Sequence, residues 1–125
     1  MNIIIMGKKQ NKKGKTPSFI RKLVQILEVS FIFIKDDKFS DLVSWLDGGN
    51  GFQILNASRF SDEVLPIYFK HKNLASFIRQ LNMYDFLRPK DSSQYVYSHP
   101  KFIRGNTNAM RFIARKIATG TQEEK

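Results

Sequence analysis

The chain has 125 residues, enough for one domain, and its 42% hydrophobic content with 11 phenylalanines predicts a single packed core. It contains no cysteine, which excludes disulfide frameworks, thiolate metal sites and cysteine nucleophiles, and its two histidines favour neither a metal site nor a cofactor. The formal net charge of +10 and the isoelectric point near 10.0 predict a polyanionic partner.

The charge is uneven along the chain. Residues 1–35 carry 8 basic residues and 1 acid, residues 36–69 carry 2 and 6, and residues 70–116 carry 10 and 2. The lysines of residues 1–15 show no periodicity, so we expect a flexible arm, which is a solubilising terminus, a nuclear-import signal or a phosphate-contacting arm. The apolar run at residues 3–6 is too short for a signal peptide or a membrane span, so a soluble intracellular protein without a membrane partner is expected.

The first predicted element is a helix over residues 17–28, with Thr16 as its N-cap and apolar residues at helical spacing. Residues 29–34 are β-branched and aromatic and favour extended structure, and residues 36–38 read as a loop. Strand-like residues 42–46 and 52–56 flank the turn Asp-Gly-Gly-Asn-Gly, which predicts an antiparallel hairpin.

A second helix is expected to begin at Ser58 as its cap, and Pro66 should kink or bulge it. After a basic turn, Asn73 is the predicted N-cap of a third helix over residues 74–84. Two more strands are expected at residues 86–88 and 95–98, and then an amphipathic segment at 108–118, closed by Gly120, with Met110, Ile113 and Ile117 on its apolar side.

This order predicts an α+β fold. The expected architecture is a winged helix-turn-helix, in which a three-helix bundle is capped by a small four-stranded antiparallel sheet. We assign residues 1–15 to a basic arm, 16–118 to the domain and 119–125 to a tail.

The third helix carries the candidate site. Its buried stripe consists of Leu74, Phe77, Ile78 and Leu81. The opposite face carries Ser76, Arg79 and Met83, with Gln80 and Asn82 on its shoulders, and no acid occurs from residue 73 to 84. Arginine forms a bidentate hydrogen bond with guanine, and asparagine or glutamine forms one with adenine. The side chains of this face are therefore suited to binding the edges of bases. The pattern of this helix alone is also compatible with an ordinary neutral polar face that is exposed to solvent and binds nothing.

Cations flank that helix. They are Lys70, His71 and Lys72 before it, and Arg88 and Lys90 after it. This placement suits phosphates on either side of a helix in the major groove. For His71 the alternative is a hydrogen-bonded turn residue.

The run Glu-Val-Leu-Pro-Ile-Tyr-Phe-Lys-His-Lys-Asn-Leu-Ala-Ser-Phe-Ile-Arg-Gln-Leu-Asn-Met-Tyr, residues 63–84, resembles the DNA-binding domain of heat shock transcription factors. The resemblance extends upstream to residues 17–19 and Trp45, and downstream to residues 99–105 and 115–116, and so covers about residues 16–118. It implies a nuclear, sequence-specific double-stranded DNA-binding protein that reads inverted nGAAn repeats, and not an enzyme.

The resemblance also implies residue roles. Arg79 would contact the guanine of GAA, and Ser76, Gln80 and Asn82 would support it or bind nearby bases and phosphates. The implied contacts to the DNA backbone are Lys70, His71, Asn73, Arg88 and Lys116.

Two features depart from the family pattern. Asp85 stands where the family usually has glycine, and the stretch 89–94 between the last two strands is shorter than the usual wing, which contacts a neighbouring protomer. No heptad pattern of the kind used for trimerisation follows residue 118, so we expect a monomer that is an excised domain, a truncated member or a lone-domain relative.

Three other classes compete with this hypothesis. A shape-directed architectural DNA binder would carry lysines where Arg79 and Asn82 stand. A hydrolase or nuclease would need clustered carboxylates or a paired nucleophile, and the aspartates between residues 36 and 47 read as solvated turn residues. A protein-interaction module would need a large exposed apolar patch, which a sequence does not exclude.

Overall fold

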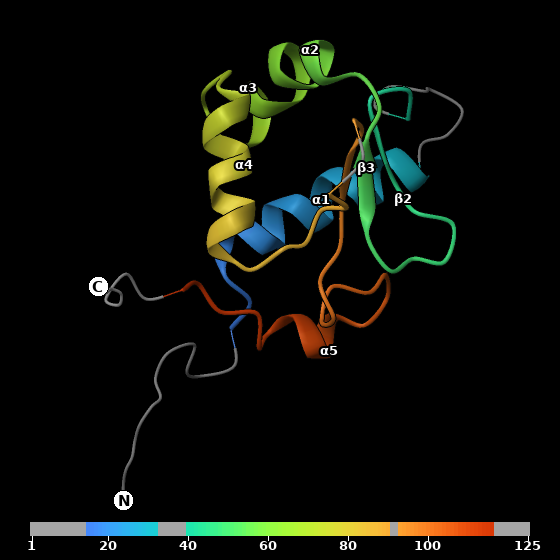
Figure 1. The fold of residues 1–125 in the computed structure, drawn as a ribbon, viewed down its shortest axis with the longest axis vertical. Helices are drawn as coiled ribbons and strands as arrows, with labels where there is room; N and C mark the ends of the chain where they lie inside the picture. Colours follow the sequence, from blue (N-terminus) through green and yellow to red (C-terminus); the bar gives the residue numbers. More distant parts are fainter. Residues whose placement is uncertain (1–14, 33–39, 91–92, 117–125) are drawn as a thin grey trace, which may run out of the picture.

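The computed structural model describes residues 15–32, 40–90 and 93–116 (Figure 1). The predictions for the basic arm, for the loop at 36–38, and for Ile117, Gly120 and the tail lie outside these residues. No helix among the described residues has the length and apolar character needed to cross a membrane.

Helix α1 (Ser18–Ile32) confirms the first predicted helix and extends it by four residues. The expectation of extended structure is therefore wrong for residues 29–32. Val29 packs against the core as a continuation of the helical stripe formed by Leu23, Ile26 and Leu27. The tertiary contact of that stripe outweighs the β propensity of a few side chains.

The sheet is antiparallel, with strands β2 (Val43–Trp45), β3 (Phe52–Ile54) and β4 (Tyr95–Tyr97) in the order β2-β3-β4. The β2-β3 pairing confirms the predicted hairpin. Gly51 allows the hairpin to approach β4, because a Cβ there would lie 2.5 Å from the Tyr97 carbonyl oxygen.

The expected fourth strand is wrong, since residues 86–88 contribute only one bridge, between Leu87 and Ser98, among the described residues. The Phe86 amide is already bonded to the Leu81 carbonyl at the end of a helix, and Pro89 has no amide hydrogen. These two neighbours prevent a longer ladder.

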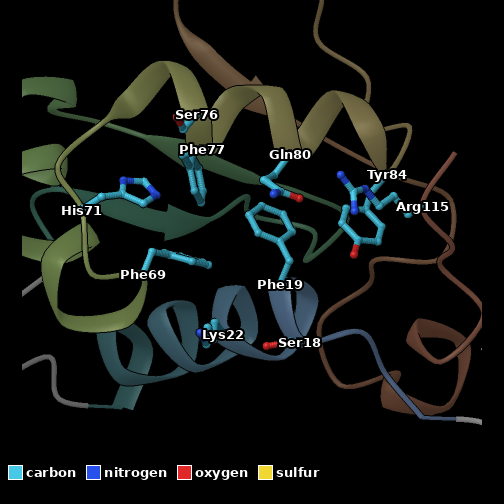
Figure 2. Close-up of a pocket in the computed structure, with 10 residues that line it drawn as sticks. All are labelled: Ser18, Phe19, Lys22, Phe69, His71, Ser76, Phe77, Gln80, Tyr84 and Arg115. Carbon is cyan, nitrogen blue, oxygen red and sulfur yellow. The ribbon is translucent and has the colours of Figure 1, made fainter. Parts of the chain in front are cut away.

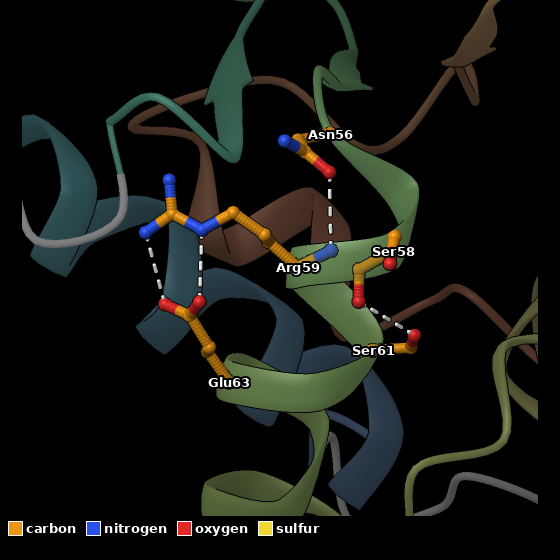
Figure 3. A network of polar contacts seen from close by, with 5 residues as sticks. All are labelled: Asn56, Ser58, Arg59, Ser61 and Glu63. Carbon is orange, nitrogen blue, oxygen red and sulfur yellow. Dashed lines mark hydrogen bonds and ion pairs between the residues drawn. The ribbon is translucent and has the colours of Figure 1, made fainter.

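The second predicted helix consists of three pieces: α2 (Ala57–Arg59), the π-helical turn η2 (Phe60–Val64) and α3 (Leu65–Tyr68). Its N-cap is Asn56 and not Ser58, because the Asn56 Oδ1 accepts a hydrogen bond from the Arg59 amide at 3.1 Å (Figure 3). The π turn confirms the bulge expected from Pro66, and in it the Leu65 amide bonds the Phe60 carbonyl.

Polar side chains brace the outer surface of this bulge. The Ser61 hydroxyl donates to the Ser58 carbonyl at 3.0 Å, and Arg59 holds both carboxylate oxygens of Glu63 at 2.8 and 3.1 Å (Figure 3). This ion pair lowers the pKa of Glu63 through its hydrogen bond with Arg59.

Helix α4 (Leu74–Met83) follows a short turn and confirms the third predicted helix and its Asn73 cap. The last helix, α5 (Thr107–Met110), has only four residues, so the amphipathic segment expected at 108–118 is helical only at its start. Met110 and Ile113 are buried as expected. Beyond them the chain turns back to α4, where the Lys116 amide bonds the Met83 carbonyl at 2.7 Å (Figure 1).

Two aromatic clusters fill the core. Under α4, Phe19 lies 5.5 Å from each of the rings of Phe69, Phe77 and Tyr84. Under the sheet, the cluster comprises Trp45, Phe52, Phe86, Tyr97 and Phe102. The first cluster packs α4 against α1. This packing determines which face of α4 is exposed to solvent.

Candidate nucleic-acid interface

The exposed face of α4 lies at Ala75, Arg79 and Asn82, whose side chains are all solvent-exposed, while Phe77 and Leu81 are buried. The exposed face is therefore rotated by part of a helical turn from the predicted one, which was centred on Ser76, Arg79 and Met83. Met83 was expected near its middle, but its sulfur is covered by Arg115, whose guanidinium nitrogens lie 3.1 and 3.3 Å away.

Arg79 and Asn82 are one helical turn apart and share this face. Neither side chain makes a hydrogen bond or ion pair with the residues that the structure describes. Their donors and acceptors are thus available to a ligand.

Ser76 and Gln80 lie on the neighbouring side of α4 and are half-buried, where they line a groove of about 300 Å³ between α4 and α1 (Figure 2). Its floor is aromatic, formed by Phe19, Phe69, Phe77 and Tyr84. His71 and Arg115 stand at opposite ends of the groove, and Lys22 lies on the α1 side (Figure 2).

The turn before α4 is held by its own polar atoms. Lys70 has a φ of 64°, the left-handed conformation that a side chain makes costly, and its side chain is exposed. The His71 Nδ1 accepts from the Asn73 amide at 3.0 Å, which leaves the proton on Nε2. The Asn73 Oδ1 accepts from the Ser76 amide at 3.0 Å, which leaves the side-chain NH₂ as a donor.

Arg88 is engaged with the sheet. Its Nε donates to the Gln94 carbonyl at 3.1 Å, and its guanidinium carbon lies 4.7 Å from the centre of the Tyr95 ring. Tyr97 lies beneath the same guanidinium at 5.7 Å, and burial raises the pKa of its hydroxyl. Arg88 therefore packs on the base of the short wing through its Nε and its planar face, and its exposed guanidinium has further N–H donors for the phosphate contact expected of it.

The end of α4 carries a Schellman motif. The Phe86 amide bonds the Leu81 carbonyl at 3.0 Å, the Asp85 amide bonds the Asn82 carbonyl at 3.1 Å, and Asp85 has a φ of 65°. The aspartate thus adopts the conformation for which glycine is preferred, and the helix still ends regularly. Asp85 also pairs with Lys116, with 3.2 Å between Oδ1 and Nζ.

Sequence reasoning placed neither Lys22 nor Arg115 in the site. Lys22 follows the buried Phe19 by one turn of α1, and its Nζ lies 5.4 Å from the centre of the Phe69 ring. The spacing of Lys22 from the apolar stripe was a usable signal. Arg115 comes to α4 through a long-range contact that no local pattern encodes.

Comparison with known proteins agrees with this geometry. The sequence pattern described as HSF-type DNA-binding matches residues 19–116. The chain is 37% identical over 116 residues to a heat shock factor protein of Xenopus laevis, covering 85% of this chain and 24% of that one. It is 41% identical over 91 residues to heat stress transcription factor C-1b of Oryza sativa subsp. japonica, covering 73% of this chain and 36% of that one.

Solved structures give the same result. Chaetomium thermophilum Skn7 with SSRE DNA superposes with a TM-score of 0.68 at 35% identity, covering 80% of this chain and all of that one. A heat shock transcription factor/DNA complex superposes with a TM-score of 0.54 at 33% identity, covering 66% and 94%. The chain spans about a quarter of the length of the animal heat shock factors that it matches. The chain belongs to the HSF-type DNA-binding family.

Proposed function

We propose that this chain is the DNA-binding part of a transcription factor, which binds duplex DNA in a sequence-specific way with α4 in the major groove. The observation that carries the proposal is the exposed face of α4. It carries the Arg79 guanidinium and the Asn82 amide, neither of which bonds another described residue. It has no acid from residue 73 to 84, and basic residues flank it on both sides. An α-helix fits the width of the major groove, where these side-chain types distinguish base pairs.

Arg79 and Asn82 are the proposed base-reading residues, because they are the most exposed polar side chains of α4. Arg79 would bond the guanine of an nGAAn unit, and Asn82 an adjacent base. Ser76 and Gln80 enter from the side of the groove in Figure 2, so they would contact bases or phosphates at the edge of the helix. Inverted nGAAn repeats are the proposed target.

The phosphate contacts would come from both ends of the groove. Lys70, Lys72, the His71 Nε2 and the Asn73 NH₂ surround the start of α4, with the donors of the histidine and the asparagine already oriented by hydrogen bonds. Arg115 and Lys116 surround its end. Backbone contacts of this kind fix the register of a helix on the duplex but carry no sequence information.

Catalysis is not part of this proposal. The HSF-type family is a family of DNA-binding transcription factors and not an enzyme class. A role in transcription would place the protein in the nucleus. Architectural binding remains the competing DNA function, and it differs because it would show little preference for sequence.

Selection from a pool of random duplexes with the whole chain tests the proposal. Random DNA is needed because Skn7, a structural relative, is known with SSRE DNA and also with HSE DNA. We expect enrichment of paired nGAAn units and an affinity that falls steeply with salt, with a log–log slope of roughly −0.9 per neutralised phosphate. Enrichment of no sequence, or an affinity that does not respond to salt, would contradict it.

A further inference from the structure

The end of α4 contains an acid in a basic surface. Between residues 65 and 116 the sequence has 10 basic residues, with acids only at 85 and 91, and Asp85 is the one acid of this range that the structure describes. Asp85 lies two residues after the end of the proposed base-reading helix, and a carboxylate repels the phosphates that the neighbouring cations would attract.

The backbone at this point leaves the carboxylate little freedom. Asp85 occupies the left-handed residue of the Schellman motif, with a φ of 65°. Its partner is fixed as well, because the Lys116 amide bonds the Met83 carbonyl at 2.7 Å and the neighbouring Arg115 lies against the Met83 sulfur. Two backbone anchors thus bring Oδ1 of Asp85 and Nζ of Lys116 to 3.2 Å.

We propose that Asp85 sets the affinity for DNA by holding the Lys116 ammonium in the way that a phosphate would hold it. This inference rests on the proposed function. A carboxylate and a phosphate offer a lysine the same kind of anionic oxygen, so the duplex must displace the carboxylate before Lys116 neutralises a phosphate. The two side chains are 60% and 57% exposed, and an exposed ion pair is weak enough to be displaced.

Asp85→Asn tests the proposal with little change to the fold, because asparagine tolerates the left-handed conformation and only the charge is removed. We expect affinity for matched and mismatched duplexes to rise together, by up to about fivefold at low salt. The log–log salt slope should change by less than the roughly 0.9 of one phosphate contact, because Lys116 neutralises a phosphate in both proteins, and base preference should be unchanged. Asp85→Gly is the second variant, which removes the charge and the backbone strain together.

The matched control is Asp85→Asn in a Lys116→Ala background. There the gain in affinity should disappear, because no lysine remains to be released. An equal gain in both backgrounds would overturn the proposal, since Asp85 would then only repel DNA. Absence of any gain in either Asp85 variant would overturn it too, if melting shows that the variants are folded. Failure of the proposed function has a different signature, because the wild-type chain would then select no sequence.

Discussion

Replacing Arg79 with alanine removes one fork donor from the exposed face of α4 and should leave the fold unchanged. The Arg79 side chain is exposed and makes no hydrogen bond or ion pair with the described residues, while the core side of α4 is formed by Phe77 and Leu81. Surface substitutions without such partners usually change the free energy of unfolding by less than about 0.5 kcal/mol. Alanine also has the highest helix propensity, so α4 itself should persist.

The expected loss is in discrimination between bases. A bidentate contact between arginine and guanine is worth about 1–3 kcal/mol against the wrong base. At 25 °C this range corresponds to a preference of about 5- to 150-fold for guanine at the first base of GAA. Arg79→Ala should therefore lose most of this preference, and because a base contact neutralises no phosphate, its binding should keep the wild-type salt slope.

The assay is a titration of matched and mismatched duplexes, which differ only at that guanine, at two salt concentrations. Arg79→Lys is the matched control, because lysine keeps the charge and loses the planar fork. It should lose part of the guanine preference, because an ammonium still donates to guanine O6 and N7 but lacks the rigid two-point geometry of a guanidinium. A folded Arg79→Ala variant that still prefers GAA by the wild-type margin would show that α4 does not read this base.

Three further predictions concern the turn before α4, the aromatic core, and His99, which follows the sheet. Lys70→Ala should weaken binding to all duplexes and make the salt slope shallower without changing base preference, and alanine keeps the Cβ at this φ of 64°, so backbone strain is unchanged. Phe77→Ala should lower the free energy of unfolding by about 3–5 kcal/mol and so lower the melting temperature. The reason is that the Phe77 ring is 1% exposed and its centre lies 5.2–5.8 Å from those of three other phenylalanine rings. Burial lowers the pKa of His99, so the stability that its neutral form contributes is complete above pH ~6.5 and is lost as pH falls through the lower folded value. Melting curves from about pH 7 to 5 should show a smaller loss in His99→Gln than in the wild type.

Elements with strong local signals were predicted well from the sequence. Asn73, followed by a helical stripe of apolar residues, predicted the start of α4 and its cap, because capping depends on side-chain oxygen and backbone within one turn. The glycine-rich turn predicted the β2-β3 hairpin for the same reason. Pro66 predicted an irregular second helix, since its missing donor acts locally.

Several wrong predictions concern contacts that the local residue pattern does not reveal. Residues 86–88 read as a strand, but the Phe86 amide is used to end α4. Residues 111–116 read as helix, but the bond from Lys116 to Met83 draws them across the end of α4. Met83 was predicted to be an exposed side chain, but the Arg115 guanidinium covers its sulfur. For residues 111–116 and for Met83, a partner more than thirty residues away decided the structure, whereas the Phe86 amide bonds Leu81 within the same helix end.

The same distinction separates the proposed phosphate contacts. His71 and Asn73 each use one polar atom in a local hydrogen bond that directs the remaining donor outward, so ordering them on DNA should cost little conformational entropy. Lys116 is held instead by Asp85, which a distant part of the chain supplies, and must leave that ion pair before it binds a phosphate. Arg88 uses its Nε on Gln94 and stacks on Tyr95, but its exposed guanidinium has further N–H donors. Residue type and position beside the helix identified His71 and Arg88 as candidates, and the family resemblance added Asn73 and Lys116. The local hydrogen bonds orient His71 and Asn73 before DNA arrives, whereas the tertiary structure occupies Lys116, so His71 and Asn73 should each contribute more to affinity than Lys116.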